Sequence, residues 1–333
     1  MKRNRRPMKQ KKKSLCVFWL ICFLCLAVGI GGYGLYRHVE TARNQREDEA
    51  LRAGMNQPGI AKGWNWKAKT VSVPRQQLFK GELILVNAQH AYHFPAQETV
   101  VSVYENKNTA YKVSNTSIRL LPKTIERLNQ MLQAFEAKTG IHEVMVTSGY
   151  RSQEKQQAVL DEKAEKQGIT EARRWAASPG CSEHHTGFAV DFGIYTDSGR
   201  SLAYTGAGDY AFLNRTAYRY GFIVRYAQEK SDITGIDDEP WHFRYVGVPH
   251  AYIMRQKNLC LEEYIDYVRA FSPTNRLRIQ DDENFAYEIY FVSAQNEEST
   301  AVQVPVALPY RISGNNVEGF IVTVELGKSK TAS

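Results

Sequence analysis

The chain has 333 residues, with 43 Lys and Arg against 35 Asp and Glu, so its formal net charge is +8. Eight of the basic residues lie in the first fourteen positions, MKRNRRPMKQKKKS, and the remaining 35 balance the 35 acidic residues. Because the excess charge is confined to one end, the high pI does not indicate nucleic-acid binding, and we expect no nucleic-acid partner.

An apolar segment follows directly. Residues 15–36, LCVFWLICFLCLAVGIGGYGLY, carry no charge and are long enough as a helix to cross a bilayer, which requires about 20 residues. A secretory signal peptide is the alternative, but it has a shorter apolar region followed by a small-residue cleavage site, and GGYGLYRHVETARNQ has no clear A-x-A site. We therefore expect a single-pass signal anchor in the cell membrane, with residues 1–14 cytoplasmic and the rest extracellular.

The cysteines agree with this placement. Three of the five lie within the apolar segment, and Cys181 and Cys260 lie outside it. An oxidising exterior permits these two to pair, so a Cys181–Cys260 disulfide is a hypothesis that the sequence alone cannot decide.

The exterior part divides by composition into three regions. Residues 37–74 are mainly polar and charge-dense and are expected to form a juxtamembrane stalk. Residues 75–271 alternate between helix and strand patterns, which indicates an α+β domain. Residues 272–333 contain alternating β-branched segments separated by turn residues, which predicts a small β-rich module with no assigned chemistry.

Periodicity and stop signals place the elements of the α+β domain. A buried strand leading into a loop is expected over 82–94. Helices are predicted over 122–140, 152–168, 209–221 and 259–271, and strands over 143–150, 187–194, 222–226 and 242–247. The first helix has Pro122 near its start and Gly140 at its end, as a helix with proper boundaries should.

Metal-ligating residue types gather in two of these segments. His184 precedes Asp191 in CSEHHTGFAVDFG, where the aspartate interrupts an apolar strand and so needs a partner or a metal. His242 lies far along the chain, three residues after Glu239. A hydrolytic zinc site needs three protein ligands and an open position, and a free carboxylate beside them can deprotonate a bound water. On spacing alone, a lone histidine of this kind is more often a structural residue than a metal ligand.

Three segments raise these odds by resemblance. SGYRSQEKQ (148–156), SEHHTGFAVD (182–191) and EPWHFRYVG (239–247) resemble, in this order, the D-alanyl-D-alanine carboxypeptidases of the VanY type, zinc enzymes related to the D-Ala-D-Ala dipeptidases and the LAS-type peptidases of the bacterial cell wall. The resemblance covers roughly residues 79–271. It implies an LAS-type zinc peptidase domain with a small mixed or antiparallel sheet, in a bacterium of the Gram-positive type.

The resemblance also assigns residues. It implies that Zn²⁺ is held by His184, Asp191 and His242, that Glu239 is the general base and acid, and that Arg151 stabilises the oxyanion. Gln156 and Ser182 match substrate-contacting positions, and Tyr150 and Trp241 are expected to line the substrate pocket.

The expected function is removal of the terminal D-Ala from peptidoglycan pentapeptide stems, or from the lipid-linked precursor that carries them. Two alternatives stay open. One is a different cut on the same scaffold, by a D-Ala-D-Ala dipeptidase or by an L,D- or endopeptidase. The other is a non-catalytic wall-binding or sensor protein that holds a metal for structure. The sequence does not predict the oligomeric state.

Overall fold

The computed structural model describes residues 42–43, 45–63, 65–97 and 99–328. The chain divides after Gly54 into two units, Met1–Gly54 and Met55–Ser333. In the first unit residues 45–54 are helical. The predicted membrane span over 15–36 lies outside the described residues. None of the helices in the described part of the chain combines the length and apolar character needed to cross a bilayer.

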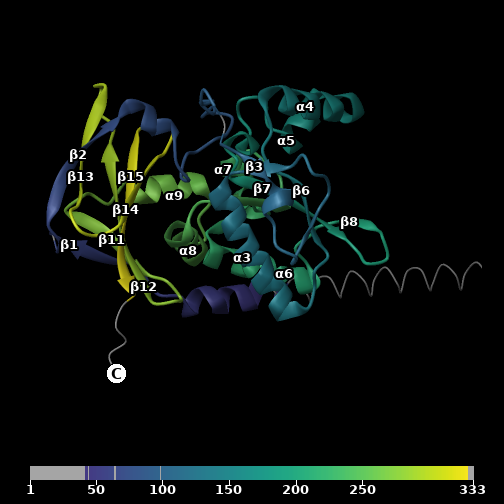
Figure 1. The fold of residues 1–333 in the computed structure, drawn as a ribbon, viewed down its shortest axis with the longest axis horizontal. Helices are drawn as coiled ribbons and strands as arrows, with labels where there is room; N and C mark the ends of the chain where they lie inside the picture. Colours follow the sequence, from purple (N-terminus) through teal and green to yellow (C-terminus); the bar gives the residue numbers. More distant parts are fainter. Residues whose placement is uncertain (1–41, 44, 64, 98, 329–333) are drawn as a thin grey trace, which may run out of the picture. The chain divides into compact units, whose positions relative to one another are not determined.

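The second unit contains helices and strands in mixed order (Figure 1). The α-helices are α2 (Val103–Asn106), α3 (Pro122–Thr139), α4 (Gln153–Gln167), α5 (Ile169–Trp175), α6 (Ala211–Thr216), α7 (Ser231–Thr234), α8 (Val248–Lys257) and α9 (Leu261–Val268). The strands are β1 (Gly59–Lys62), β2 (Ala68–Pro74), β3 (Val101–Ser102), β4 (Lys112–Val113), β5 (Arg119–Leu120), β6 (Val144–Ser148), β7 (Ala189–Tyr195), β8 (Ser201–Ala203), β9 (Phe222–Tyr226), β10 (Glu239–Tyr245), β11 (Asn275–Gln280), β12 (Phe285–Ser293), β13 (Ser299–Pro305), β14 (Tyr310–Gly314) and β15 (Gly319–Lys328).

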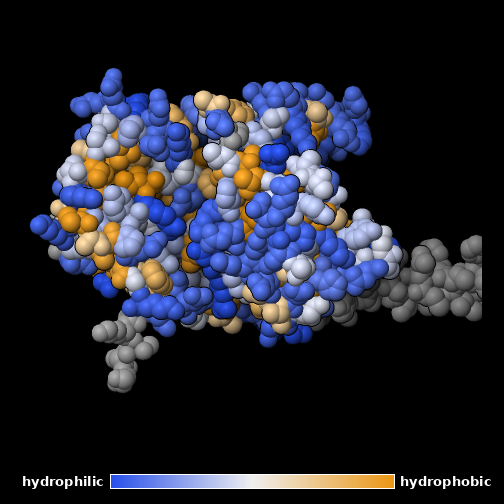
Figure 2. Space-filling view, viewed as in Figure 1, coloured by the Kyte–Doolittle hydropathy of each residue, from blue (hydrophilic) through white to orange (hydrophobic). Residues whose placement is uncertain are grey.

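A mixed sheet with strand order β4-β6-β7-β10-β9 carries the site, and β8 pairs with β7 at its side. Only the β4–β6 pair of this sheet is parallel among the described strands. Helix α3 packs its apolar stripe against the sheet, with Leu128 and Phe135 in one core with Val146 and Phe192. Its polar face is turned outward, and hydrophilic residues cover α3 and α4 on the face shown in Figure 2.

Helix α3 confirms the periodicity argument. Pro122 stands in its first turn, where a missing N–H costs nothing, and Gly140 ends it with φ 74°. The predicted helix over 209–221 is helical in three shorter pieces, a 3-10 turn at Gly208–Tyr210, α6, and a 3-10 turn η4 at Ala217–Tyr220.

The C-terminal β module is larger than the sequence suggested. Its five-stranded sheet has the order β1-β11-β12-β15-β14, and β13 pairs with β2 in a second, two-stranded sheet. Residues 59–62 and 68–74, which the sequence analysis placed in a stalk, therefore form strands of this module. Their pairing partners lie more than 200 residues away in sequence, so local composition does not reveal them.

The prediction of a strand over 82–94 is wrong, because the structure has no strand there. Leu83 to Val86 are nevertheless buried. The backbone N–H and C=O groups of this run form hydrogen bonds with groups other than a neighbouring strand. The Leu83 N–H donates to Ser313 Oγ at 3.0 Å, and the carbonyl of Ile84 accepts from the Arg244 guanidinium at 2.9 Å. A buried apolar run can thus have irregular structure, because side chains supply hydrogen bonds that a neighbouring strand would otherwise make.

Candidate metal centre and active site

The three candidate ligands come together on adjacent strands. His184 lies in the 3-10 turn η2 (Glu183–Thr186), which leads into β7, and Asp191 lies within β7. His242 lies on β10, directly opposite Asp191 in the antiparallel register. One ligand atom from each residue can be chosen so that all three lie within 4.8 Å of one another. Among the described residues this is the one group of its kind.

The distances fit a single small cation. His184 Nε2 lies 3.1 Å from Asp191 Oδ2, and His242 Nδ1 lies 2.8 Å from Asp191 Oδ1. Ligand atoms bound tetrahedrally to one zinc ion at about 2.0–2.1 Å lie roughly 3.3 Å apart, close to these separations. His184 Nδ1 is turned away and lies 2.6 Å from the Gly149 carbonyl, which fixes the ring with Nε2 toward the cluster. The donor set and its orientation therefore suit Zn²⁺.

The electrostatics of the two histidines differ. Burial, with help from the Arg151 cation, lowers the pKa of His184 to about 4, so this ring is neutral and ready to bind a metal. Burial would also lower the pKa of His242, but the hydrogen bond to Asp191 and the nearby carboxylate of Glu183 outweigh it and raise that pKa to about 9. His242 is thus protonated at neutral pH until a metal displaces the proton.

Glu183 is a residue of the site that the sequence analysis missed. It is fully buried, and its Oε2 lies 3.5 Å from His242 Nε2. Its Oε1 accepts hydrogen bonds from Arg225 Nε and Arg244 Nη1, both at 2.8 Å. Although burial alone would raise it, these two guanidinium groups hold the pKa of Glu183 far below its usual range. A permanent carboxylate therefore faces the far side of the His242 ring, where it fixes the ring's orientation.

Glu239 stands beside the cluster without joining it. Its Oε2 is 4.0 Å from His242 Nδ1, beyond hydrogen-bond distance. Burial raises the pKa of Glu239 to about 7, with the Asp191 carboxylate adding to the rise. A carboxyl group that titrates near neutrality can both accept and return a proton, which is what a general base and acid requires.

Arg151 is held rigidly at the edge of the cluster. Its Nη2 donates to Asp191 Oδ2 at 3.0 Å and to Ser148 Oγ at 2.9 Å. Its Nη1 donates to Gln156 Oε1 at 3.0 Å, and Gln156 in turn donates to the Ala177 carbonyl at 2.8 Å. Gln156, expected to contact substrate, is buried and acts here on Arg151.

A second contact fixes the backbone of Arg151. His185, the neighbour of the candidate ligand His184, is fully buried. Its Nδ1 lies 2.8 Å from the Arg151 carbonyl, and its Nε2 accepts from the Gly180 N–H at 3.0 Å. The ring thereby links Arg151 to the loop that carries Cys181.

The hypothetical Cys181–Cys260 disulfide is absent from the structure, because both residues are free thiols.

A cavity of about 120 Å³ opens onto the cluster. The three candidate ligands, Glu239 and Arg151 all line it, together with Gln156, Ser182 and Trp241. Tyr150 is not among the lining residues. Ser182 is buried, and its hydroxyl accepts from the His184 N–H at 3.4 Å, so it also supports the turn that presents His184.

Lys163 lines the same cavity and was not singled out from the sequence. Its Nζ donates to the Trp175 carbonyl at 3.3 Å, and its charge opposes the rise in the Glu239 pKa. Lys163 follows Gln156 by seven residues on α4, which puts both on one helix face. That spacing was the available signal, but a lysine among the many charges of α4 does not stand out.

Comparison with known proteins agrees with this geometry. The family model for VanY, D-alanyl-D-alanine carboxypeptidase, matches residues 117–248, which include every residue of the site described above. A D-alanyl-D-alanine carboxypeptidase of Enterococcus faecium is 30% identical over 300 residues, covering 88% of this chain and 90% of that protein. Another from Enterococcus faecalis is 38% identical over 276 residues, covering 79% of this chain and 94% of that protein.

A solved structure shares the fold. The vancomycin-resistance D,D-dipeptidase VanXYg, in complex with a D-Ala-D-Ala phosphinate analogue, superposes with a TM-score of 0.70 at 31% identity. The superposition covers 78% of this chain and 99% of that one, which establishes the mixed α/β fold of the LAS-type peptidases. The chain belongs to the VanY family of D-alanyl-D-alanine carboxypeptidases.

Proposed function

We propose that this protein is a membrane-anchored, zinc-dependent carboxypeptidase that removes the terminal D-Ala from peptidoglycan pentapeptide stems. The observation that carries the proposal is the convergence of His184, Asp191 and His242 in one cavity with a separate carboxylate, Glu239, and a fixed cation, Arg151. A structural zinc site is normally closed by four ligands. Three ligand residues with a non-ligating glutamate beside them favour a catalytic site.

The residues divide the chemistry between them. When bound, zinc would act as a Lewis acid that makes a water molecule acidic enough to be deprotonated near neutral pH. Glu239 accepts the proton of the attacking water and later donates it to the leaving amine of D-Ala. Its pKa of about 7 in the metal-free protein suits both roles.

Arg151 supplies a positive charge for the oxygen of the carbonyl group that the water attacks. Negative charge develops on the carbonyl oxygen of the bond that is cut, and a guanidinium fixed in advance stabilises it without reorganisation. Ser148 and Gln156 hold that guanidinium in place through hydrogen bonds of 2.9–3.1 Å. The rigid placement is the property that oxyanion stabilisation requires.

The proposed location rests on the amino-acid sequence. The apolar segment over residues 15–36 would anchor the protein in the cell membrane with the site outside. There it would meet stem peptides of new peptidoglycan and of the lipid-linked precursor, both ending in D-Ala-D-Ala. Trimming of the stem would remove the terminal residue that crosslinking uses as a leaving group.

A second candidate function is hydrolysis of free D-Ala-D-Ala. It is favoured by the similarity to VanXYg, which is described as a D,D-dipeptidase and superposes over 78% of this chain. Both reactions would use the same catalytic residues. The space that the site leaves at the amino end of D-Ala-D-Ala would determine whether a stem peptide or only the free dipeptide fits.

Product analysis separates these functions. Full-length zinc-loaded protein is incubated with a pentapeptide stem and, separately, with free D-Ala-D-Ala, and the products are identified by mass spectrometry. Tetrapeptide and D-Ala in equal amounts would support the carboxypeptidase. D-Ala from the dipeptide alone would support the dipeptidase, and an internal cut in the stem would support an endopeptidase. Failure to cut either substrate or intact sacculi, despite bound zinc, would favour a non-catalytic binding protein.

A further inference from the structure

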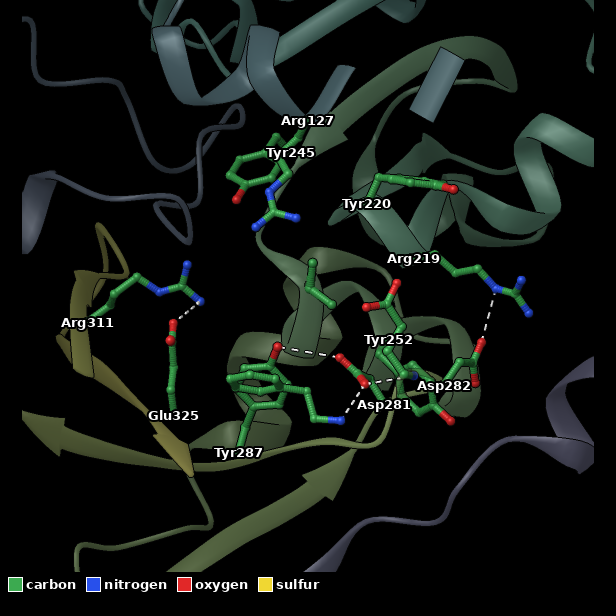
Figure 3. A pocket seen from close by; sticks show the side chains of 13 residues that line it. Arg127, Arg219, Tyr220, Tyr245, Tyr252, Asp281, Asp282, Tyr287, Arg311 and Glu325 are labelled. Carbon is green, nitrogen blue, oxygen red and sulfur yellow. Dashed lines mark hydrogen bonds and ion pairs between the residues drawn. The ribbon is translucent and has the colours of Figure 1, made fainter. Parts of the chain in front are cut away.

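A second, larger cavity lies between the peptidase domain and the C-terminal β module. Its volume is about 530 Å³, and Figure 3 shows the side chains that line it. On the peptidase side they come from α3, η4, β10 and α8, and on the module side from β12, β14, β15 and the turn that joins β11 to β12. None of the residues assigned above to the catalytic machinery lines it. It is thus a separate place in the molecule.

The first cation of this cavity is Arg127 on α3. Its Nη1 donates to Gln130 Oε1 at 3.2 Å. Its Nε is buried and makes no hydrogen bond, and the Glu126 carboxylate stands 3.9 Å from it, beyond hydrogen-bond distance. A buried N–H donor without an acceptor is unfavourable, so Arg127 keeps a donor available for a ligand.

The second cation is Arg311 on β14, and it is in a similar state. Its Nε is also buried without a hydrogen bond. The nearest carboxylate oxygens stand at ion-pair distance only, Glu82 Oε1 at 3.7 Å from Nε and Glu325 Oε1 at 3.8 Å from Nη2. The charge of Arg311 is partly balanced, but its hydrogen-bonding capacity is not used by these carboxylates.

The two guanidinium groups face the same space. In Figure 3 Arg127 points into the cavity beside Tyr245, and Arg311 points toward it from β14. Burial and the Glu82 carboxylate raise the pKa of Tyr245, and the charges of Arg311 and Arg127 both oppose that rise, as expected if both lie near its hydroxyl. Two cations from different parts of the fold therefore line the same cavity as the Tyr245 phenol.

The two aspartates of the cavity, by contrast, are already engaged. Asp281 Oδ1 accepts from the N–H groups of Glu283 and Phe285 at 3.0 and 2.9 Å. Asp282 pairs with Arg219 Nε at 3.0 Å and accepts from the Tyr218 hydroxyl at 2.7 Å. Both aspartates therefore already have hydrogen-bond partners, whereas the Nε donors of Arg127 and Arg311 do not.

We propose that this cavity binds an oxyanion, with Arg127 and Arg311 as its two guanidinium clamps. Arginine forks match carboxylate and phosphate geometry bidentately, and the tyrosines of the cavity, Tyr220, Tyr245, Tyr252 and Tyr287, would wall the rest of the ligand. The volume exceeds that of a single anion and suits a larger molecule bearing one. For this protein the group could come from the carboxylate of a stem peptide or from the phosphate of a lipid-linked precursor, and the same clamp would recognise both.

Calorimetric titration of the full-length protein tests the site. The two probes are inorganic phosphate and the tetrapeptide that ends in a single D-Ala. We expect at least one probe to bind, and the double variant Arg127→Gln/Arg311→Gln to weaken that binding tenfold or more. The probe that binds and is lost identifies the source of the anion. Binding of neither probe to the wild type, or equal binding to wild type and double variant, would overturn the proposal.

Three further variants keep the result interpretable. Arg151→Gln removes the active-site cation, so binding that persists in it belongs to the second cavity. Arg278→Gln removes an arginine of the β module that lies outside the cavity and should leave binding unchanged. If the double Gln variant does not fold, Arg127→Lys/Arg311→Lys keeps both charges without the fork and should still weaken binding. Unchanged D-Ala release in the double variant would show that the proposed enzymatic function is unaffected, so the two proposals can fail separately.

Discussion

Glu183 and His242 face each other in the protein interior with 3.5 Å between Oε2 and Nε2, and neither atom hydrogen-bonds to any other group. The other ring nitrogen of His242 points to Asp191. A carboxylate on the far side of a metal-binding histidine sets the tautomer and raises the basicity of the ring. Glu183 therefore belongs to the site as a positioning residue.

Replacing Glu183 with Gln should weaken zinc binding by about 10–100-fold, the usual effect of losing such a partner. Competition with a chromogenic chelator measures this without reference to activity. Glu262→Gln is the matched control, because Glu262 pairs with Arg225 at 2.7 Å and shares the same buried network. If both variants lose zinc equally, Glu183 acts only through the stability of that network.

Replacing Arg151 with Gln should lower kcat/KM by about 10²–10³-fold, as for the loss of one preorganised oxyanion donor. Zinc affinity should not fall, because Arg151 is a cation beside Asp191 and its charge opposes that of the metal. Steady-state kinetics and zinc content, measured on the same samples, check both statements. The exposed Arg173→Gln serves as control, and an equal loss of activity in it would contradict the assigned role.

Zinc binding should release protons. His242, with a pKa of about 9, is protonated at pH 7 and must lose that proton to become a ligand, whereas His184, with a pKa of about 4, has none to lose. We expect close to one proton from His242 per zinc at pH 7, and an affinity that rises roughly tenfold per pH unit toward pH 9. Calorimetry in buffers of different ionisation enthalpy counts the protons. The Glu239→Gln variant removes the second titrating group, and pH-independent affinity in it would contradict the assignment.

Glu239 should make the metal-free protein less stable as pH rises. Burial raises its pKa from 4.5 to about 7 in the folded chain, so its contribution to stability is fully present below about pH 4.5 and is lost as pH rises through about 7. The difference amounts to roughly 3 kcal/mol at about 1.4 kcal/mol per pH unit. In denaturant unfolding with a chelator present, the free energy of unfolding of Glu239→Gln should rise relative to that of the wild type between pH 5 and pH 8. A constant difference between the two would refute the raised pKa.

How far the sequence predicts this molecule depends on how local each signal is. Helix α3 could be predicted because its apolar spacing and both of its end signals lie within 19 residues, 122–140. Strands β1 and β2 could not, because their partners, β11 and β13, stand more than 200 residues away. The buried run after Glu82 has the apolar pattern of a strand, and periodicity does not reveal that Arg244 and Ser313 form hydrogen bonds with its backbone.

The same reasoning applies to the site. The motif residues were found by residue type and resemblance, and the register of β7 and β10 then explains why Asp191 and His242 meet. Glu183 and Lys163 were missed because charged residues are common in such segments, and only the fold shows that one is fully buried against His242 and the other lines the cavity.

The most direct test is D-Ala release from a pentapeptide stem by full-length protein, as wild type and as Glu239→Gln, with the zinc content of each sample measured. We expect release in proportion to bound zinc, and a Glu239→Gln protein that binds zinc but releases D-Ala about 10²–10⁴-fold more slowly. Release that survives zinc removal, or that Glu239→Gln leaves unchanged, would contradict the proposed zinc carboxypeptidase.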